Sequence, residues 1–448
     1  MRNRHTHTRR GFLGALAGGV AAVSLTEAKV HALARPGGTR AAGRSPNDTL
    51  QIALIGAGGM GVEDTKTALT VEGTRLVAVC DLYDGRLAEA RELWGLDIFT
   101  TRDYREVLAR ADVDAVIVGT PDHWHQRISV DALDQGKSVY CEKPMVQSLG
   151  EGDAVIAAQK RSKAVFQVGS QGMSSLGNEK ARELLAAGAI GTLNYAEGFW
   201  ARNSPVGAWQ YPVPEDASEQ TVDWDRFLGA TAKRPFDPIR FFRWRNYRDY
   251  GTGVSGDLFV HLFSSLHFIT GSMGPTTIMA SGGLRHWKDG RDAPDIMLGM
   301  FDYPETAAHP PFNLSLRVNF VDGTSGSTYL RLVGSEGALD VTWDDVTLKR
   351  CKRWDPVRAI QKEFRHDPEP EGRKEMLQTS ATVYRVEQGY KGAHYDHFNN
   401  FFSAIRAGKP AIEDAVFGYR AAAPALACNQ SYYDRRAITW DPVAMKVK

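Results

Sequence analysis

Three side chains have types and spacings suited to moving a proton and stabilising an oxyanion. Asp257 and His261 stand four positions apart in residues 256–270, an expected helix, so they share one helix face. The histidine can take or give a proton near neutral pH, and the carboxylate can orient it or bond a hydroxyl group. The ammonium of Lys143 can stabilise charge on a reacting oxygen. Two simpler interpretations stay open: a surface acid–histidine pair, and an ion pair between Lys143 and Glu142.

The histidines and cysteines do not form a metal-binding pattern. His123 and His125 are separated by one residue in an expected loop and have no evident third ligand. Neither CxxC spacing nor a companion HxxxH occurs among the four cysteines, which are Cys80, Cys141, Cys351 and Cys428. We therefore expect no metal site and no disulfide framework, and each cysteine is expected to be a small core residue.

A glycine-rich turn follows the apolar run at residues 50–55, which is expected to be a buried strand. In this turn, GAGGMG, Gly56 permits a tight turn and Gly58 lets the backbone approach a diphosphate. Gly61 lets the following helix pack on the strand, and the amides at the helix N-terminus attract negative charge. The order of strand, turn and helix indicates a dinucleotide-binding unit. A glycine-rich turn in another kind of α/β domain is the alternative.

The next expected strand, residues 75–80, ends in Asp81, which lies 20 residues past Gly61. A carboxylate at this position bonds both ribose hydroxyls of the adenosine and repels a 2′-phosphate, which favours NAD. Arg86 follows closely and leaves NADP open. Asp81 could also serve only as a cap for the helix expected at residues 84–94.

Strands and helices continue to alternate to residue 169. The further strands are expected at 114–119, 138–141 and 164–169, and the helices at 103–110, 126–135 and 148–161. This alternation predicts a parallel, doubly wound sheet, in which ligands bind beyond the carboxyl ends of the strands. Two polar clusters fall at such ends, TPDHWH at residues 120–125 and EKP at residues 142–144.

These motifs resemble those of the Gfo/Idh/MocA oxidoreductases, over nearly all of the chain beyond residue 34. The most specific parts are GxGxxG at 56–61, TPxxxH at 120–125, EKP at 142–144 and GVSGDLFVH at 253–261. The segments 181–191 and 397–408 are also similar to the family's. The resemblance implies an N-terminal Rossmann domain and then an α+β domain, whose large, mostly antiparallel sheet supports the substrate and often the oligomer interface.

The resemblance also assigns residue roles. Lys143, Asp257 and His261 are implied to be catalytic. The residues expected to contact the cofactor are Gly56, Gly58, Gly59, Met60, Gly61, Asp81, Arg86, Thr120, Pro121, His125, Glu142 and Lys143. The chain departs from the family pattern one turn beyond His261, where members often carry another acid. Here Ser264 and Ser265 stand instead, with His267 further on, so the proton relay and the substrate contacts stay open.

The second domain is expected to span residues 171–448, after a Rossmann domain at 49–170. Strand-like alternation occurs at 193–201, 296–301, 312–320, 326–333 and 338–343. Two long excursions, 202–250 and 351–392, are rich in proline, aromatic and charged residues, and loops of this length usually carry function or subunit contacts. The helices expected near 394–407 and 414–434 are interpreted as structural. Tyr390, Lys391 and His394 could line the site from its far side.

Aromatic and arginine side chains cluster in the first excursion. They are found in residues 240–247, and also at Trp200, Arg202, Asn203 and Trp209. Such a mixture suits stacking on a sugar ring while bonding hydroxyls or a carboxylate. Core or interface packing is an equally good explanation for any single aromatic residue.

The first 34 residues match an export signal. TRRGFL at residues 8–13 is a twin-arginine pattern, an apolar stretch follows to Leu25, and Ala32-Leu33-Ala34 offers a cleavage site before a linker at 35–48. About 14 apolar residues fall short of the roughly 20 that span a membrane, so cleavage is expected rather than anchoring. We expect export in a folded state by the twin-arginine machinery to the periplasm or medium, with no membrane association afterwards.

Composition limits the remaining possibilities. The 448 residues include 54 basic and 53 acidic side chains and are 43% hydrophobic, which describes a globular protein of two or three domains. Disorder, collagen and an integral membrane protein fit poorly. The near-neutral charge lacks the electrostatic footprint of nucleic-acid binding.

Together these features predict an exported NAD(P)-dependent oxidoreductase, expected to be a homo-oligomer. It would transfer a hydride to or from a secondary alcohol carbon of a sugar, polyol or related small molecule. No NAD(H) pool is maintained outside the cytoplasm, so we expect a tightly held cofactor that is regenerated in place. Two alternatives remain: an NAD-dependent glycoside-cleaving enzyme that uses transient oxidation, and a non-catalytic nucleotide-binding module.

Overall fold

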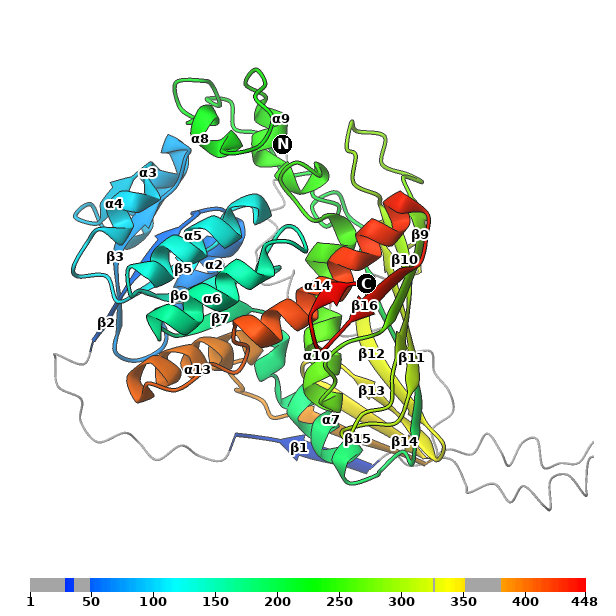
Figure 1. Cartoon of the computed structure of the whole chain (residues 1–448). Coiled ribbons are helices and arrows are strands. Elements are labelled where there is room, and N and C mark those ends of the chain that lie inside the picture. Colours follow the sequence, from blue (N-terminus) through cyan, green and yellow to red (C-terminus); the bar gives the residue numbers. More distant parts are fainter. Residues whose placement is uncertain (1–28, 36–48, 325–326, 351–379) are drawn as a thin grey trace, which may run out of the picture.

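The computed structural model describes residues 29–35, 49–324, 327–350 and 380–448. It consists of two lobes, each built on one β-sheet (Figure 1). Four features of the sequence analysis lie outside the described residues: the signal up to residue 28, the linker at 36–48, Cys351 and the excursion at 351–379.

The first lobe contains a six-stranded sheet of order β4-β3-β2-β5-β6-β7, and every neighbouring pair is parallel. The strands are β2 (Leu50–Ile55), β3 (Thr74–Cys80), β4 (Phe99–Thr101), β5 (Ala115–Val118), β6 (Ser138–Glu142) and β7 (Phe166–Gly169). The predicted doubly wound sheet is therefore confirmed. Strand β4 was not anticipated, because its three residues are only partly buried and show no apolar run.

Helices cover both faces of this sheet. They include α2 (Gly59–Ala68), α3 (Asp84–Trp94), α4 (Tyr104–Leu108), α5 (His125–Asp134) and α6 (Gly152–Ser162). The alternation of side chains along β2 sends Ile52 and Leu54 into one core and Ala53 and Ile55 into another. Helix α13 (Ala393–Ala407) packs on the first of these faces through Phe398, so a helix near the C-terminus completes the core of the first lobe.

The second lobe contains an eleven-stranded sheet of order β1-β15-β14-β13-β12-β8-β11-β10-β9-β16-β17. Its strands are β1 (Lys29–Leu33), β8 (Leu193–Ala201), β9 (Thr277–Gly283), β10 (Ile296–Tyr303), β11 (Phe312–Asn319), β12 (Thr328–Gly334), β13 (Gly337–Val341), β14 (Asp345–Arg350), β15 (Ser380–Val386), β16 (Ile438–Asp441) and β17 (Lys446–Val447). Pairing is antiparallel except between β1 and β15 and between β8 and β11. This confirms the expected large, mostly antiparallel sheet.

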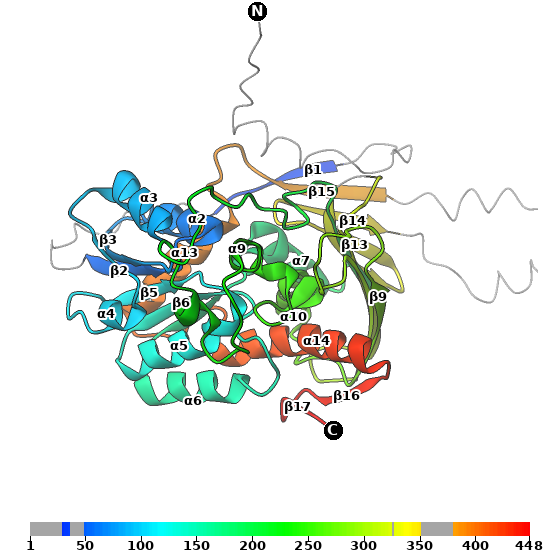
Figure 2. The ribbon, with the colours of Figure 1, turned by 90° about the horizontal axis from the view of Figure 1, so that it is seen from above.

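Three helices line the face of this sheet that is turned toward the first lobe (Figures 1 and 2). They are α7 (Leu176–Ala186), α10 (Val260–Thr270) and α14 (Ala415–Asp434). On the other face, Leu298 and Met300 of β10 remain 46% and 59% exposed, while their neighbours Met297 and Phe301 are buried. Of the helices in the described residues, none has the length and apolar character needed to cross a membrane.

Strand β1 lies parallel to β15 at the outer edge of the sheet (Figure 2). Just after it, Arg35 forms ion pairs with Glu179 of α7 and Asp396 of α13. The strand therefore uses residues that the expected cleavage after Ala34 would remove. The expected signal and the edge of this sheet therefore share residues 29–33, so cleavage at the expected position would remove a strand.

The first excursion, residues 202–250, lies above the first lobe (Figure 1). It contains the short helices α8 (Trp224–Leu228) and α9 (Pro238–Phe242), and it bridges to the first lobe through the backbone of Val222 and Tyr83. Its aromatic residues form a separate hydrophobic cluster around Phe227 and Tyr250. This cluster covers the carboxyl ends of β3 and β5, where the site lies.

Candidate active site

The glycine turn has the space that a diphosphate requires. Gly56 has a φ of +96°, and a Cβ added at Gly61 would stand 2.1 Å from the Gly56 carbonyl oxygen, so both positions need glycine. A Cβ at Gly58 would meet nothing nearer than the Arg86 guanidinium at 3.7 Å, and one at Gly59 would meet nothing within 4 Å. The turn is thus closed where helix meets strand and open toward the cleft, as a dinucleotide-binding turn must be.

Asp81 and Arg86 lie together at the edge of this cleft. The Asp81 carboxylate accepts hydrogen bonds from the amides of Ala57 (2.8 Å) and Tyr83 (3.0 Å), and it pairs with Arg86 at 3.4 Å. Each carboxylate oxygen accepts from one backbone amide and from Arg86, so a ribose hydroxyl would take the place of the Arg86 contact. The Arg86 guanidinium lies 5.4 Å from the ring centroid of Phe242. The cleft is also lined by Ile55, Gly56, Leu82, Thr120, Pro121, Trp124, Phe241 and Trp244, among others.

His125 links the two polar clusters through both of its ring nitrogens. Its Nδ1 lies 2.7 Å from the Pro144 carbonyl oxygen and its Nε2 lies 2.8 Å from the Thr120 carbonyl oxygen. Carbonyl oxygens only accept hydrogen bonds, so both ring nitrogens must donate and the ring is cationic. Burial opposes this charge, but Cys141, Asp122 and the Pro144 carbonyl raise the pKa of His125 to about 10. These two bonds give His125 a positioning role, and its expected contact with the cofactor stays a prediction.

Lys143 and Asp257 form a buried ion pair. The Lys143 Nζ donates to Asp257 Oδ1 at 2.8 Å and to the Asp257 backbone carbonyl at 3.0 Å, and the side chains are 9% and 6% exposed. Arg245 donates to the same Oδ1 at 3.3 Å. Burial alone would raise the pKa of Asp257, but Lys143 and Arg245 lower it well below its usual range. Lys143 thus pairs with Asp257 and not with Glu142.

His261 lies beside this pair on the second lobe. The expected helix begins as a π-helical turn at Ser255–Phe259 and continues as α10. The His261 ring centroid lies 5.0 Å from that of Trp200 and 6.1 Å from that of Trp343. Its buried Nδ1 has no hydrogen-bond partner among the described groups, so Asp257 does not orient it. Burial and the Lys143 charge lower the pKa of His261 well below its ordinary value, which keeps the ring neutral.

Glu142 faces the protein interior behind Lys143. Its Oε1 accepts a hydrogen bond from Gln171 Nε2 at 2.8 Å, and only 5% of the residue is exposed. Burial and the nearby Asp64 raise the pKa of Glu142 to about 8. Asp64, on the buried face of α2, accepts from His394 Nε2 at 2.7 Å. Glu142 is therefore part of a buried carboxyl network, and its expected contact with the cofactor stays a prediction.

The residues around His394 do not line the site from the far side as expected. Tyr390 donates to Asp396 at 2.8 Å, and Lys391 lies over the ring of Tyr395. His394 itself contacts Asp64 of the buried network through Nε2 and Thr67 through Nδ1. This segment supports the site from behind.

An acid does lie near the turn beyond His261, although it comes from a distant part of the chain. Ser264 Oγ donates to Glu413 Oε1 at 2.8 Å, and burial raises the pKa of Glu413 to about 8. Ser265 accepts from Asn178, and His267 pairs with Tyr303 at 2.8 Å. The sequence gives no local signal for Glu413, because 149 positions separate it from Ser264.

The aromatic and arginine residues expected to bind a sugar fall into two groups: some line the nucleotide cleft or the core, and others lie near Asp257 and His261. Phe241 and Trp244 line the nucleotide cleft, and Trp209 is a core residue packed on Phe320. Asn203 is exposed. Of the residues expected to contact a sugar, Trp200 faces His261, Arg245 contacts Asp257, and Arg202 lies close enough to Asp257 for each charge to shift the pKa of the other.

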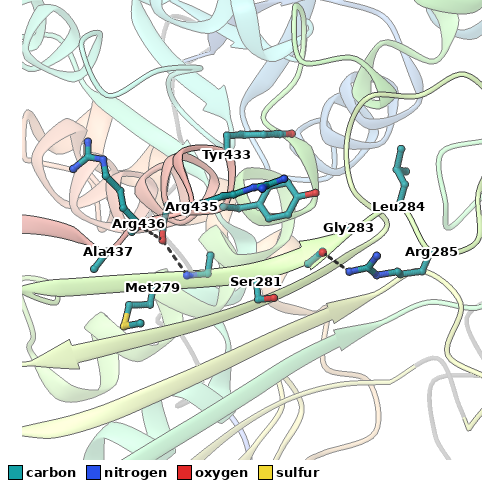
Figure 3. A pocket seen from close by; sticks show the side chains of 13 residues that line it. Met279, Ser281, Gly283, Leu284, Arg285, Tyr433, Arg435, Arg436 and Ala437 are labelled. Carbon is teal, nitrogen blue, oxygen red and sulfur yellow. Dashed lines mark hydrogen bonds between the residues drawn. The ribbon is translucent and has the colours of Figure 1, made fainter.

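Two other kinds of site can be separated from this one. A hollow of roughly 730 Å³ lies between β9 and the C-terminal end of α14 (Figure 3). Its lining includes Arg285, Tyr433 and Arg435, but none of the expected catalytic residues. The described residues contain no group of three or more His, Cys, Asp or Glu side chains arranged to bind a metal. Cys80, Cys141 and Cys428 are buried and free, as expected.

Sequence profiles match both lobes. Residues 50–170 match an oxidoreductase family with an NAD-binding Rossmann fold, and residues 182–440 match the C-terminal alpha/beta domain of the same family. The chain belongs to the Gfo/Idh/MocA family. Its first lobe is therefore an NAD-binding domain, in agreement with the open glycine turn.

Relatives in this family act on polyhydroxylated molecules, to judge by their names. Inositol 2-dehydrogenase of Salmonella typhimurium is 30% identical over 37% of this chain and 49% of its own length. A 2,7-anhydro-N-acetylneuraminate hydratase of Mediterraneibacter gnavus is 31% identical over 36% of this chain and 43% of its own length. The chain thus aligns with about half the length of these curated relatives.

Solved structures share the fold over most of the chain. A levoglucosan dehydrogenase in complex with NADH and levoglucosan has a TM-score of 0.64 and 17% identity, over 87% of this chain and 99% of that one. An oxidoreductase domain protein of Kribbella flavida has a TM-score of 0.65 and 19% identity, over 87% and 98%. At these identities the likeness concerns the fold alone.

Proposed function

We propose that this member of the Gfo/Idh/MocA family is an NAD-dependent oxidoreductase acting on a secondary alcohol of a sugar, polyol or related molecule. The observation that carries the proposal is the buried Lys143–Asp257 pair beside a neutral His261, at the carboxyl end of β6 and next to the nucleotide cleft. The relatives named inositol 2-dehydrogenase support the substrate class.

The three side chains divide the chemistry of an alcohol oxidation. When bound, NAD supplies the hydride acceptor, which takes the hydrogen and its two bonding electrons from the carbinol carbon. His261, neutral and without a partner at Nδ1, accepts the hydroxyl proton. Lys143, held in place by two bonds to Asp257, stabilises the negative charge on the substrate oxygen until the carbonyl has formed. Reduction of a carbonyl uses the same groups in reverse.

The proposal is tested with the purified full chain. Mass spectrometry quantifies the bound nucleotide, and the NADH absorbance measures turnover of a panel of polyols and sugars. Lys143→Met and His261→Ala are expected to retain nucleotide and lose turnover by at least a hundredfold. Lys409→Met and His286→Ala, exposed residues of the same types, serve as matched controls. Full turnover in either site variant would remove that residue from the mechanism.

A redox-neutral reaction is the second candidate, and one observation favours it. The Mediterraneibacter gnavus relative is named a hydratase, so an enzyme of this kind can add or remove water without net oxidation. In this chain the same groups would oxidise a carbinol, allow elimination or hydrolysis of a neighbouring bond, and then return the hydride. Release of an aglycone from aryl glycosides without added NAD supports this candidate. A non-catalytic module is disfavoured by the intact Lys143, Asp257 and His261.

We also propose that the protein is exported folded by the twin-arginine route and retains its cofactor through successive turnovers. The TRRGFL pattern supports export, and the cover formed by residues 202–250 over the nucleotide cleft supports retention. Dialysis of the protein followed by turnover without added NAD tests retention of the cofactor.

The exposed Leu298 and Met300 of β10 support a homo-oligomer. Sedimentation of the purified protein measures the number of subunits.

A further inference from the structure

Arg202 is a partly buried cation without an anionic partner. It directly follows β8, and its backbone is fixed by bonds to Asn319 (2.9 Å) and Asp322 (3.1 Å). Its guanidinium donates to the Gly207 carbonyl at 2.9 Å and lies 5.7 Å from the Phe320 ring centroid. Within the residues that the structure describes, no carboxylate lies within ion-pairing distance of it. Burial lowers the pKa of Arg202, which shows that its charge is held away from water at a free-energy cost.

The groups around Arg202 leave a surplus of positive charge at the catalytic groups. Lys143 and Arg245 share one carboxylate, that of Asp257, at 2.8 and 3.3 Å. The charge of Asp122 also acts on Arg245. Asp122 is buried, accepts both the amide and the hydroxyl of Thr252, and burial raises its pKa. Three cations therefore lie near one carboxylate, that of Asp257, which pairs with Lys143 and Arg245 but not with Arg202. An arriving anion would be stabilised there.

We propose that the substrate carries a carboxylate, as in a uronic, aldonic or nonulosonic acid, and that Arg202 binds it. This inference rests on the proposed function and names its substrate class. A guanidinium presents a planar fork of donors that matches a carboxylate, and the bond to Gly207 fixes the orientation of that fork. Trp200, two positions before Arg202, and Trp343 flank His261 and offer faces on which a sugar ring can pack.

An anionic substrate would also make His261 a more effective general base. The pKa of His261 is lowered first by burial and then by nearby charges that include Lys143 and Arg202. A carboxylate bound at Arg202 offsets part of that positive charge and moves the pKa of His261 back toward neutrality, where a general base is most effective. Acidic substrates are therefore expected to turn over faster, and not only to bind more tightly, than their neutral counterparts.

A purely structural role for Arg202 makes a different prediction. Its bond to Gly207 and its place over Phe320 could simply stabilise the turn after β8. Substitution would then lower stability and affect acidic and neutral ligands alike. A guanidinium also binds phosphate, so a phosphorylated sugar is the other source of the same chemistry and needs its own arm in the experiment.

The test is calorimetric titration of the full chain, saturated with NAD, with matched ligand pairs. The pairs are glucuronate with glucose, galacturonate with galactose and gluconate with glucitol, and N-acetylneuraminate and glucose 6-phosphate are added as single probes. We expect at least one carboxylate to bind at least tenfold more tightly than its neutral partner, and more tightly than the phosphate. Arg202→Gln should abolish that preference and Arg202→Lys should keep part of it. Arg285→Gln, an exposed arginine, should leave it unchanged.

Three results would overturn the inference: no carboxylate preferred in any pair, glucose 6-phosphate as the preferred ligand, or a preference that survives Arg202→Gln. Retained nucleotide and an unchanged circular dichroism spectrum show that each variant has folded. Binding is measured without turnover, so the two proposals fail separately. Turnover of neutral polyols without an acid preference overturns only this inference, whereas tight carboxylate binding without hydride transfer overturns only the proposed function.

Discussion

Lys143 of the first lobe and Asp257 of the second are joined by a 2.8 Å ion pair that is almost fully buried. The pair links the end of β6 to the π-helical turn that precedes α10, so the ammonium that we propose to be catalytic is positioned by the lobe that also carries His261. In the proposed mechanism, a nucleotide held by the first lobe and a substrate held by the second would meet at this hydrogen-bonded contact.

Replacing Asp257 with Asn should destabilise the protein and reduce turnover. Removing one partner of a buried ion pair leaves the other charge uncompensated, which costs about 3–5 kcal/mol. Lys143 would also lose its orientation. Denaturant unfolding measures the loss, and Glu63→Gln, which breaks the exposed pair with Lys66, should change the free energy of unfolding by less than about 1 kcal/mol. Equal losses of unfolding free energy in the two variants would show that the buried pair stabilises the protein no more than the exposed pair does.

Turnover should persist at acidic pH, because the proposed base, His261, stays unprotonated there. Because burial and Lys143 lower the pKa of His261, the ring stays unprotonated below its ordinary value of 6.5, and activity should fall only as the pH drops through that lowered pKa. Arg202→Gln removes one of the charges that lower it, so the acid limb of kcat/KM should move to higher pH. An acid limb that stays in place in this variant would exclude electrostatic coupling between the two residues.

The elements of the first lobe follow from sequence because each strand is an apolar run next to turn residues. Strand β2 and helix α3 begin and end where the sequence predicts. Strands β9 and β14 were not anticipated, because each mixes polar and apolar residues and neither is a continuous apolar run. Strand β1 was assigned to the export signal, and nothing local indicates that it pairs with residues more than 350 positions away.

The sequence predicts which residues gather at the candidate site, but not which of them form hydrogen bonds with one another. Lys143, Asp257 and His261 are brought together, whereas Glu142 and His125 take other partners. Contacts such as that of Arg245 with Asp257 depend on how the excursion folds over the sheet. One signal was available for the buried network: Asp64 occupies the helix face defined by Gly61, Thr65 and Ala68, where an acid needs a partner.

Stability should fall as the pH rises from about 6.5 to about 8. Below this window the lowered pKa values of buried histidines such as His123 and His397 act in the opposite sense. Burial raises the pKa of both Glu142 and Glu413 from 4.5 to about 8, so the folded protein binds more protons than the unfolded chain in this window. By linkage, the free energy of unfolding decreases with pH wherever the native state holds the extra protons. Glu142→Gln and Glu413→Gln should each flatten this dependence in thermal unfolding, and exposed Glu89→Gln should not. A flat wild-type profile across the window would contradict the raised pKa values.

Cofactor choice should depend on Asp81. Its carboxylate holds Arg86 at 3.4 Å and opposes a 2′-phosphate, so NAD should bind more tightly than NADP. Asp81→Ser removes the negative charge, keeps a hydroxyl that can accept from the Ala57 amide, and frees Arg86. The ratio of the Kd values for NADP and NAD should fall by at least tenfold, as measured by nucleotide titration. The double variant with Arg86→Gln should reverse that gain, and a ratio unchanged in both would place the ribose elsewhere.

The edge strand β1 should stabilise the protein measurably. Its five-residue pairing with β15 and the ion pairs of Arg35 tie the segment to α7 and α13. A chain that begins at residue 29 should therefore have a Tm several degrees higher than one that begins at residue 36. Arg35→Gln in the longer chain separates the contribution of the ion pairs from that of the strand. The N-terminus of the exported protein, determined by mass spectrometry, should lie before residue 29 if the strand belongs to the mature fold. An N-terminus at Arg35 together with equal Tm values would show that the signal ends where the sequence predicts and that the second sheet is complete without β1.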